Sequence, residues 1–502
     1  MLELSDITLR LRADDRTLTE GFSFTLSRGD RAVLIGEEGN GKSTLLRYIV
    51  DPGSVEAYCE CSGRVSASGP VGYLPQSMPD ALRELTAAEY FGSAAYYDHL
   101  GVLGELGIDT DFLSSDRKLG TLSGGEKVRA QLARMLMDDP DVLLLDEPTN
   151  DLDIPTLEWL ERFLNTARQP VLFISHDETL IENTANVIIH IEQLLHKRET
   201  KITVTRAPYR EYLRRRGRLF EHQNQVAFKQ RADYDRQMQR WRQIHDRVEH
   251  EQQTISRGDP HGGRLLKKKM RSVQATGRRL ERAAEDFTDF AHQEEAILTR
   301  FDEDIRLPAG KSVLDFSLGR LAVGDRELAR NIRLSVTGGE PVGIIGPNGA
   351  GKSTLLELLW EELRARRDIT AAWMPQDYAR ALPFDKTPIG FLTRSGSREE
   401  SVLIHNRLAS MRFTFEEMNG PIAALSGGQR AKLLFLDMVL RRADVLLLDE
   451  PTRNFSPLSA PVVREALRAF GGAIISVSHD RKYLAEVCTA VYELTPEGLV
   501  KR

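Results

Sequence analysis

Two short stretches of the 502-residue chain have the composition of loops that bind phosphate groups. They read GEEGNGKST at 36–44 and GPNGAGKST at 346–354. A glycine-rich turn that opens a helix lets backbone N–H groups surround phosphates at the positive end of the helix. Lys42 and Lys352 are placed to reach the β- and γ-phosphates of a nucleotide. The stretches therefore predict two nucleoside triphosphate sites.

Oxygen-bearing side chains near each stretch could hold Mg²⁺, which prefers such ligands. A serine follows each lysine, an aspartate ends each LLLD run at 143–146 and 446–449, and a glutamine ends each of YLPQ and WMPQ. The glutamines fit a loop that senses the metal and the γ-phosphate. The predicted metal ligands are Ser43, Gln76, Asp146, Ser353, Gln376 and Asp449.

A glutamate directly follows each of the two aspartates, within LLLDEPT. Glu147 and Glu450 are placed to orient or deprotonate the attacking water. A glutamate after an aspartate is usually a solvated pair, but the motif favours catalysis here. His176 and His479, each in a Ser-His-Asp sequence, fit a switch that contacts the γ-phosphate. These four residues are the predicted catalytic residues.

The motifs belong to an internal repeat. LSGGE at 122–126 returns as LSGGQ at 425–429, and the offset is 303 residues for the motif serine, glutamate and histidine alike. Continuous apolar runs at 32–36, 142–146 and 171–175 recur in the second half, which favours parallel strands covered on both faces. The fold class predicted is α/β, with two tandem P-loop domains.

The segment between the repeats has a different character. Residues 206–282 carry 21 Lys and Arg against 9 Asp and Glu, a balance of +12, whereas the whole chain carries −6. Such polarisation indicates a polyanionic partner, with nucleic acid as the first candidate. Apolar residues recur every seven positions, first at Leu213, Phe220, Ala227, Tyr234, Trp241, Val248 and Ile255. A second register follows at Leu266, Val273, Leu280, Phe287 and, after an interruption at Glu294, Phe301, with Met270, Ala284, Ala291, Leu298 and Ile305 four residues on.

This periodicity predicts two long antiparallel helices joined by a turn at 258–263. A helix over 209–257 would be roughly 70 Å long. The predicted domains are 1–207, the basic hairpin at 208–305, and 306–502.

Composition indicates the cellular compartment in which we expect the protein to act. No apolar run approaches the ~20 residues that cross a bilayer, and the N-terminus has no secretory pattern. Cys59, Cys61 and Cys488 are too few for a disulfide framework or a four-cysteine metal site. We therefore expect a cytoplasmic protein that does not engage membranes.

The combined motifs resemble those of ATP-binding-cassette (ABC) ATPases over about four-fifths of the chain. The resemblance implies ATP and Mg²⁺ as cofactors, hydrolysis of ATP, and a monomer whose two domains close head to tail. One site would join Lys42, Glu147 and His176 to the 425–429 loop, and the other Lys352, Glu450 and His479 to the 122–126 loop. The predicted nucleotide-binding residues are Gly36, Gly39, Asn40, Gly41, Lys42, Ser43, Thr44, Gln76, Ser123, Gly124, Gly125, Gly346, Asn348, Gly349, Gly351, Lys352, Ser353, Thr354, Gln376, Ser426, Gly427 and Gly428.

Tandem cassettes with an interposed basic hairpin resemble the ABC-F family, whose members act on the ribosome. The resemblance implies the 70S ribosome as partner, with the hairpin entering the tRNA exit site and contacting 23S rRNA and P-site tRNA. Cationic side chains suit RNA phosphates. The predicted RNA-binding residues are Arg214, Arg215, Arg216, Arg240, Arg242, Arg264, Lys267, Lys268, Lys269, Arg271, Arg278 and Arg279.

Within this family the sequence favours antibiotic protection over housekeeping translation. The 450–459 stretch, EPTRNFSPLS, resembles the resistance subgroup. The 46 residues between Gln76 and Ser123 leave no room for the extra arm of some housekeeping members, and the chain ends about 20 residues after His479, without the C-terminal coiled coil of others. Housekeeping activity is the main alternative, followed by the ATPase subunit of a transporter and by a chromosome or repair ATPase.

Two departures from the family pattern carry expectations. Leu11 and Leu321 stand where an adenine-stacking aromatic is usual, which predicts loose base recognition. Asp153 in the first repeat is matched by Ser456 in the second, which predicts unequal hydrolysis at the two sites. The tip at 255–268 is expected to act on the drug site, directly or by remodelling it.

Overall fold

The computed structural model describes residues 1–92, 99–150, 152–194, 199–254, 260–285, 287–288, 301, 305–324 and 326–502. These residues form two compact units. One contains both repeats, over Met1–Tyr209 and Glu294–Arg502, and the other is Arg210–Gln293.

The first repeat is built on a six-stranded sheet in which all neighbours are parallel except the last pair. Its strands in spatial order are β5 (Val71–Leu74), β6 (Val142–Asp146), β7 (Val171–Ile174), β3 (Arg31–Ile35), β8 (Val187–Leu194) and β9 (Glu199–Thr205). The three apolar runs predicted as core strands are β3, β6 and β7. β6 and β7 are buried at every residue, as expected for strands covered on both faces.

A second, antiparallel sheet packs on this domain through an apolar cluster. Its strands are β1 (Leu2–Leu11), β2 (Thr17–Leu26) and β4 (Cys59–Ala67), in the order β2-β1-β4. Leu4 and Leu9 of β1 share this cluster with Leu45 and Leu46 of the helix that follows β3. The helices of the domain are α1 (Lys42–Val50), α2 (Pro52–Glu56), α3 (Asp80–Arg83), α4 (Ala87–Phe91), α5 (Leu100–Glu105), α6 (Thr110–Leu113), α7 (Gly124–Met137), α8 (Ile154–Thr166) and α9 (Glu178–Thr184).

The second repeat has the same sheet topology. Its strands in spatial order are β13 (Ala371–Met374), β14 (Val445–Asp449), β15 (Ala473–Val477), β12 (Pro341–Ile345), β16 (Ala490–Thr495) and β17 (Gly498–Lys501). The pair β10 (Ser312–Val323) and β11 (Arg326–Thr337) forms the accompanying antiparallel sheet. The structure thus confirms the α/β class and the internal repeat.

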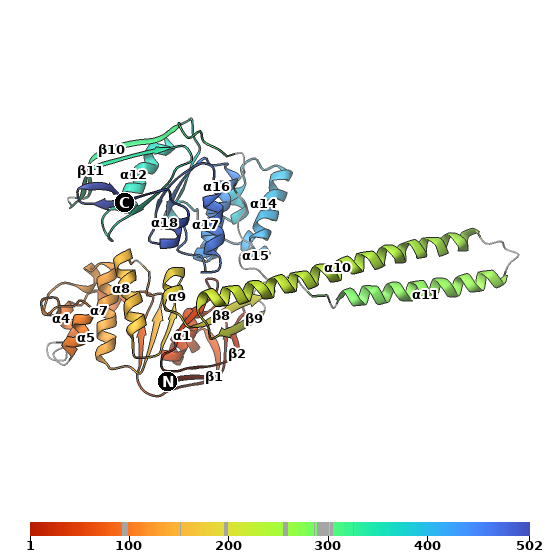
Figure 1. Ribbon diagram of the computed structural model, residues 1–502, viewed down its shortest axis with the longest axis horizontal. Coiled ribbons are helices and arrows are strands. Elements are labelled where there is room, and N and C mark those ends of the chain that lie inside the picture. Colours follow the sequence, from red (N-terminus) through yellow and green to blue (C-terminus); the bar gives the residue numbers. More distant parts are fainter. Residues whose placement is uncertain are drawn as a thin grey trace. The chain divides into compact units, whose positions relative to one another are not determined.

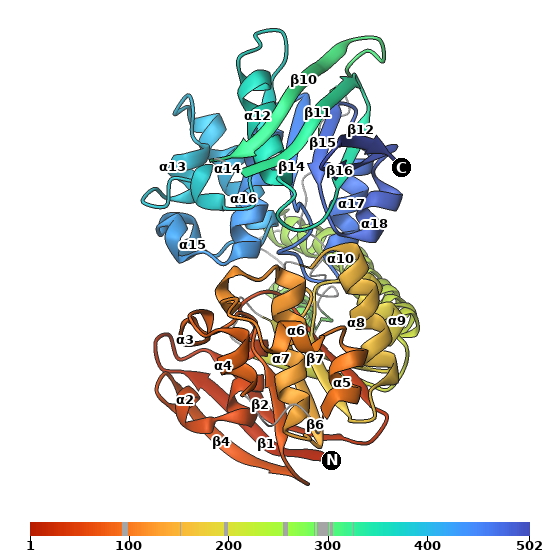
Figure 2. The same cartoon turned by 90° about the vertical axis from the view of Figure 1, so that its left-hand side faces the viewer.

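Successive side chains of β14 pack on opposite faces of the sheet, against different layers. Val445 and Leu447 pack on one face with β10, β11 and α12 (Lys352–Arg364). Leu446 and Leu448 pack on the other face with α16 (Gly427–Leu440), α17 (Ala460–Arg468) and α18 (Arg481–Glu486). The layers can be followed in Figure 2. The helices of this domain are α12 (Lys352–Arg364), α13 (Pro388–Leu392), α14 (Arg398–Ser410), α15 (Phe415–Asn419), α16 (Gly427–Leu440), α17 (Ala460–Arg468) and α18 (Arg481–Glu486).

The other unit is the predicted antiparallel helical hairpin, seen in Figure 1. α10 (Tyr209–Thr254) has 46 residues, and α11 (Pro260–Glu285) has 26. Ala227, Val248 and Leu280 of the predicted stripe are buried. The Trp241 indole N–H donates to the Val273 carbonyl oxygen at 2.7 Å, which fixes the register of the two helices.

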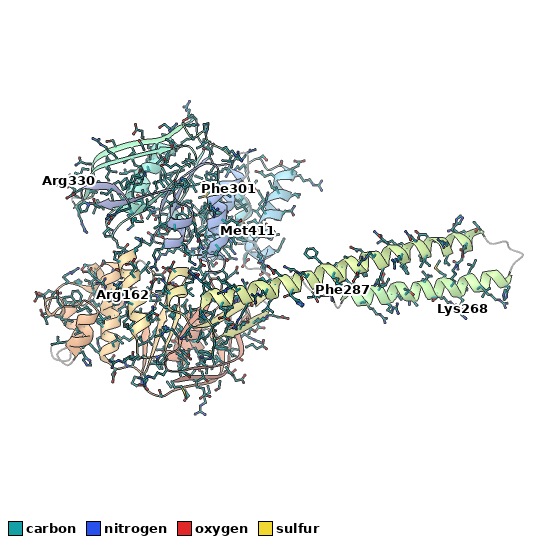
Figure 3. All side chains as sticks on the ribbon, in the orientation of Figure 1. Arg162, Lys268, Phe287, Phe301, Arg330 and Met411 are labelled. Atoms are coloured by element: carbon teal, nitrogen blue, oxygen red, sulfur yellow. The ribbon has the colours of Figure 1, made fainter. Side chains whose placement is uncertain are left out.

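The structure of the hairpin differs from the prediction in two details. Gly262 and Gly263 of the expected turn are helical, because Pro260 can begin a helix where its missing N–H costs no hydrogen bond. Phe301, labelled in Figure 3, and Ile305 are buried in the second α/β domain. The ring centroids of Phe301 and Phe470 are 4.7 Å apart. Ile255, residues 258–259, Ala291 and Leu298, with part of the expected tip, lie outside the described residues.

Substituting Gly277 tests the packing of the hairpin. An added Cβ would lie 2.9 Å from Cε2 and Cζ2 of Trp241, a ring held in place by its hydrogen bond. We expect Gly277→Ala to destabilise the hairpin by about 1–3 kcal/mol, the usual cost of overpacking. Hydrogen exchange of the α11 amides, read by mass spectrometry, should show faster exchange.

Gly217→Ala is the matched control, because its added Cβ would have no described atom within 4 Å apart from its chain neighbours and the nearby backbone of α10. This substitution should stabilise α10 by about 1 kcal/mol through helix propensity alone. Unchanged exchange in Gly277→Ala would contradict the packing described.

Candidate active sites

The first phosphate loop joins β3 to α1 and owes its shape to three glycines. Gly36, Gly39 and Gly41 have φ of 147°, 81° and 85°, where a side chain is strained. An added Cβ at Gly36 would also lie 2.4 Å from the Ile191 carbonyl oxygen. Lys42 Nζ donates to the carbonyl oxygens of Gly36 and Glu37 at 2.8 and 2.9 Å, so the lysine holds the loop that it follows.

A cavity of about 390 Å³ lies at this loop. Gly36 and Asn40 do not line it. The Asn40 side chain is buried and donates to the Ile191 carbonyl oxygen at 3.0 Å, so this side chain anchors the loop to β8 and is not directed to a ligand. The predicted residues that do line the cavity are Gly39, Gly41, Lys42, Ser43, Thr44, Gln76, Glu147 and His176.

The second loop repeats this construction between β12 and α12. Gly346, Gly349 and Gly351 have φ of 153°, 79° and 95°, and Lys352 Nζ donates to the Gly346 and Pro347 carbonyl oxygens at 2.8 and 2.9 Å. The cavity here has a volume of about 570 Å³. Its predicted lining residues are Asn348, Gly349, Gly351, Lys352, Ser353, Thr354, Gln376, Asp449, Glu450, His479 and, from the first domain, Gly124 and His176, which lines both cavities.

Each loop brings a serine hydroxyl to the strand-end aspartate predicted as a metal ligand. Ser43 Oγ donates to Asp146 Oδ1 at 2.9 Å, and Ser353 hydrogen-bonds to Asp449. Burial raises the pKa of both aspartates, and these hydrogen bonds offset part of that rise. A buried carboxylate beside a hydroxyl is an oxygen donor set that a divalent cation would stabilise, so these residues fit Mg²⁺.

The two predicted catalytic glutamates have an uncommon backbone conformation. Glu147 and Glu450 have φ of 51° and 53°, and their N–H groups donate to the carbonyl oxygens of Ile174 and Val477 at 3.1 and 2.9 Å. Non-glycine residues in this region are strained and cluster at functional sites. The turn directs each carboxylate toward the histidine at the end of the neighbouring strand.

The glutamate–histidine pairs differ between the sites. His176 Nε2 lies 3.0 Å from Glu147 Oε1, whereas His479 Nε2 lies 3.9 Å from Glu450 Oε1. Burial favours a higher pKa at Glu147, but His176 and Lys42 outweigh it and lower the pKa. At Glu450, burial and the charge of Asp449 raise the pKa to about 7. The two predicted bases are therefore electrostatically unequal.

The LSGG loops each open a helix. Ser123 accepts a hydrogen bond from the Glu126 N–H at the start of α7, and Ser426 accepts one from the Gln429 N–H at the start of α16, both at 3.3 Å. Gly125 and Gly428 of these loops lie close to atoms of their own domains. A Cβ at Gly125 would lie 2.9 Å from Thr156 Oγ1, and one at Gly428 would lie 2.8 Å from the Asn454 carbonyl oxygen.

Contacts between the two α/β domains lie beside the first site, although Ser426, Gly427 and Gly428 do not line its cavity. The Gly428 N–H donates to Glu38 Oε2 at 2.5 Å. His176 Nδ1 lies 2.8 Å from the Phe455 carbonyl oxygen. Because a carbonyl only accepts, Nδ1 is the donor, and the other ring nitrogen faces Glu147.

Asp153 and Ser456 occupy matching positions in the two repeats, and each accepts a hydrogen bond from the backbone N–H three residues later. Asp153 accepts from the Thr156 N–H at 3.2 Å, and Ser456 Oγ accepts from the Ser459 N–H at 3.2 Å. Only Asp153 carries a charge, and that charge raises the pKa of Lys352 against the dominant lowering by burial. The charge of Asp153 is therefore a further electrostatic difference between the two ATP sites.

A set of ion pairs that motif reasoning missed also joins the domains. Arg464 of α17 and Lys482 of α18 each place a nitrogen 2.8 Å from a carboxylate oxygen of Glu178 in α9, and Arg481 pairs with Glu161. These side chains lie outside every repeated motif, and no periodic signal could have found them.

Of the two leucines at the usual position of the adenine-stacking aromatic, only Leu11 lines a cavity at a phosphate loop. Leu11 lines the first cavity. Leu321 is buried under Gly351 and does not line the second cavity, where Val323, Arg326 and Leu328 lie instead. In the second domain, the position at which an aromatic residue is usual therefore did not identify the residues that line the cavity.

Eleven of the twelve predicted RNA-binding side chains are exposed on the hairpin; Figure 3 labels Lys268 on α11. Arg216 differs: it is 8% exposed, and its guanidinium lies 4.4 Å from the Phe220 ring centroid. We therefore leave Arg216 out of the cationic surface, which comprises Arg214, Arg215, Arg240, Arg242, Arg264, Lys267, Lys268, Lys269, Arg271, Arg278 and Arg279.

Two phosphate loops, two LSGG helix starts and paired Asp-Glu strand ends define a tandem ABC ATPase. A family model described as "ABC transporter" matches residues 19–150 and 329–453. In the described parts of the chain, no helix combines the length and apolarity that crossing a membrane demands. The protein binds and hydrolyses ATP.

Three relatives align over nearly the whole chain. The tylosin resistance ATP-binding protein TlrC of Streptomyces fradiae is 30% identical, covering 99% of this chain and 98% of that protein. The ribosome protection protein VmlR of Bacillus subtilis is 27% identical (97% and 86%), and ABC transporter F family member 5 of Arabidopsis thaliana is 26% identical (95% and 73%). The chain belongs to the ABC-F family.

The fold also resembles a solved structure, the crystal structure of the complex of archaeal ribosomal stalk protein aP1 and archaeal ribosome recycling factor aABCE1. The TM-score is 0.58 at 17% identity, covering 99% of this chain and 90% of that one. At this identity the likeness concerns the fold alone.

Proposed function

We propose that this ABC-F ATPase binds the 70S ribosome, inserts its hairpin at the tRNA exit site toward the peptidyl-transferase centre, and protects the ribosome from antibiotics that bind there. The observation that carries the proposal is the hairpin surface. Eleven of the twelve predicted RNA-binding cations are exposed on one helical hairpin of a chain whose net charge is −6. Cations concentrated in this way bind RNA phosphates, and arginine also stacks on unpaired bases.

Binding and hydrolysis of ATP at the two sites would drive a cycle of ribosome binding and release. Lys42 and Lys352 would bind phosphates, and the LSGG loop of the opposite domain would complete each site. Glu147 and Glu450 would orient or deprotonate the water, and His176 and His479 would contact the γ-phosphate. Mg²⁺, when bound, would neutralise phosphate charge, and Ser43, Gln76 and Asp146, with Ser353, Gln376 and Asp449, would hold it.

ATP would close the two domains and stabilise the ribosome-bound state, and hydrolysis would open them and release the protein. ATP can shift this equilibrium only through a higher affinity for the closed form. The contacts of Gly428 with Glu38 and of His176 with Phe455 support closure, because each joins a site residue of one domain to a loop of the other.

Protection from antibiotics is favoured by two observations. The 450–459 stretch resembles the resistance subgroup, and TlrC and VmlR are named for resistance and ribosome protection. A housekeeping translation factor that rescues or regulates stalled ribosomes is the second candidate, favoured by a match over 95% of this chain to ABC transporter F family member 5, which carries no such name.

Expression in a susceptible bacterium decides between the two. Inhibitory concentrations would be measured for lincosamides, pleuromutilins, streptogramins A, phenicols, oxazolidinones and macrolides. We expect the wild-type chain to raise the inhibitory concentration for at least one class, and the Glu147→Gln/Glu450→Gln variant to give no such rise. A flat panel at matched expression would overturn the protection proposal in favour of the housekeeping one.

A further inference from the structure

The two phosphate loops differ in charge. The first reads GEEGNGKST and the second GPNGAGKST, so Glu37 and Glu38 stand where the second loop has Pro347 and Asn348. Carboxylates are unexpected in a segment that binds phosphate, because like charges repel at such short range. Only the first site carries this pair.

Glu38 contacts the LSGG loop that faces it. Its Oε2 accepts the Gly428 N–H at 2.5 Å. A Cβ added at Gly427 would lie 3.0 and 3.1 Å from the two carboxylate oxygens of Glu38, so the carboxylate lies against both glycines. α16 begins at Gly427, and the N-terminus of a helix attracts an anion through its unpaired N–H groups and its dipole. Glu38 therefore occupies an anion-binding position.

Glu37 makes a second contact with the same helix. Its Oε1 lies 3.5 Å from Lys432 Nζ, and Lys432 is 8% exposed. The backbone of Glu37 also accepts from Lys42 Nζ at 2.9 Å. Both acidic residues thus join the first phosphate loop to α16.

The second site has no equivalent charge on its phosphate loop. Asn348 replaces Glu38 and lines the cavity together with Gly124 of the opposing LSGG loop. A neutral amide does not compete with a phosphate for an anion position as a carboxylate does.

We propose that Glu38 makes the two ATP sites unequal, by holding the anion position of the 425–429 loop that the terminal phosphate of ATP would take. This inference rests on the proposed role of the LSGG loops in completing the sites. ATP then competes with an intramolecular carboxylate at the first site only. The first site binds ATP more weakly, and the second site is the one that responds to ATP.

The test measures nucleotide affinity at one site at a time. In a Lys352→Ala background, which disables the second site, Glu38→Asn should tighten binding of a fluorescent non-hydrolysable ATP analogue with Mg²⁺ by about tenfold, within the usual range of coupling between sites. Glu38 is exposed, so the substitution should not impair folding. Glu38→Gln, which removes charge and keeps length, should tighten binding in the same direction.

The matched control places Glu38→Asn in a Lys42→Ala background, where affinity at the second site should not change. Unchanged affinity at the first site, or equal tightening at both sites, would overturn the inference. Ser426→Arg, added to Glu38→Asn, tests the premise separately. If this addition does not weaken binding at the first site, the LSGG loop does not complete that site and the proposed function of the loop fails. If it does weaken binding, the premise stands.

Discussion

The Glu147→Gln/Glu450→Gln variant should lose ATP turnover by about 10²- to 10⁴-fold, the range that a general base contributes, and should remain on ribosomes in the presence of ATP. Glutamine keeps the shape of each side chain but cannot accept a proton from water. Both side chains are at least 85% buried beside a histidine, so bulk water cannot replace the missing base.

Turnover would be followed as phosphate release, and retention by sedimentation of 70S particles from cells that express the variant. Glu465→Gln, an exposed carboxylate of α17, is the control and should match the wild type in both assays. Turnover near the wild-type rate together with ribosomes free of the variant would refute the catalytic assignment. We expect the two single variants to differ in turnover, because the sites are unequal.

Neutralising the lysine cluster of α11 should produce the second largest effect. The Lys267→Gln/Lys268→Gln/Lys269→Gln variant should bind ribosomes more weakly and with a slope of log affinity against log salt that is smaller by about 2–3, roughly one unit for each phosphate that a lysine no longer neutralises. Lys269 also pairs with Glu251 at 3.0 Å, but an exposed pair contributes little to stability. The hairpin should therefore stay folded.

Binding would be measured by filter retention across a series of salt concentrations. The matched control removes three exposed cations of the α/β domains, in Arg64→Gln/Lys201→Gln/Arg333→Gln, and should change the slope less. ATP turnover without ribosomes should be equal in all three proteins. An unchanged salt slope in the α11 variant would show that these lysines do not contact RNA.

Sequence reasoning predicted the elements that carry repeated or buried patterns. Val142–Asp146 and Val445–Asp449 are strands as expected, because five consecutive apolar or strand-ending residues fit a sheet covered on both faces. The offset of 303 residues relates Asp146 to Asp449 and Glu147 to Glu450, and the repeated GKST sequence relates Lys42 to Lys352, so equivalent positions in the two domains could be paired without the structure.

Features that depend on distant parts of the chain could not be predicted. The contact of Glu38 with Gly428 joins residues 390 positions apart. Phe301 kept the seven-residue spacing of the hairpin, yet burial against Phe470 places it in the second domain. Periodicity reports that a residue is apolar at regular spacing, but it does not report which core buries that residue.

The central claim is that ATP-driven closure of two ABC domains presents a cationic hairpin to ribosomal RNA. The most direct measurement is co-sedimentation of the purified full-length chain with 70S ribosomes at physiological salt, with a non-hydrolysable ATP analogue or with ADP. The account predicts that the protein sediments with ribosomes in the analogue and is released in ADP. Equal binding in both nucleotides, or absence from ribosomes with retention on membranes or duplex DNA, would contradict it.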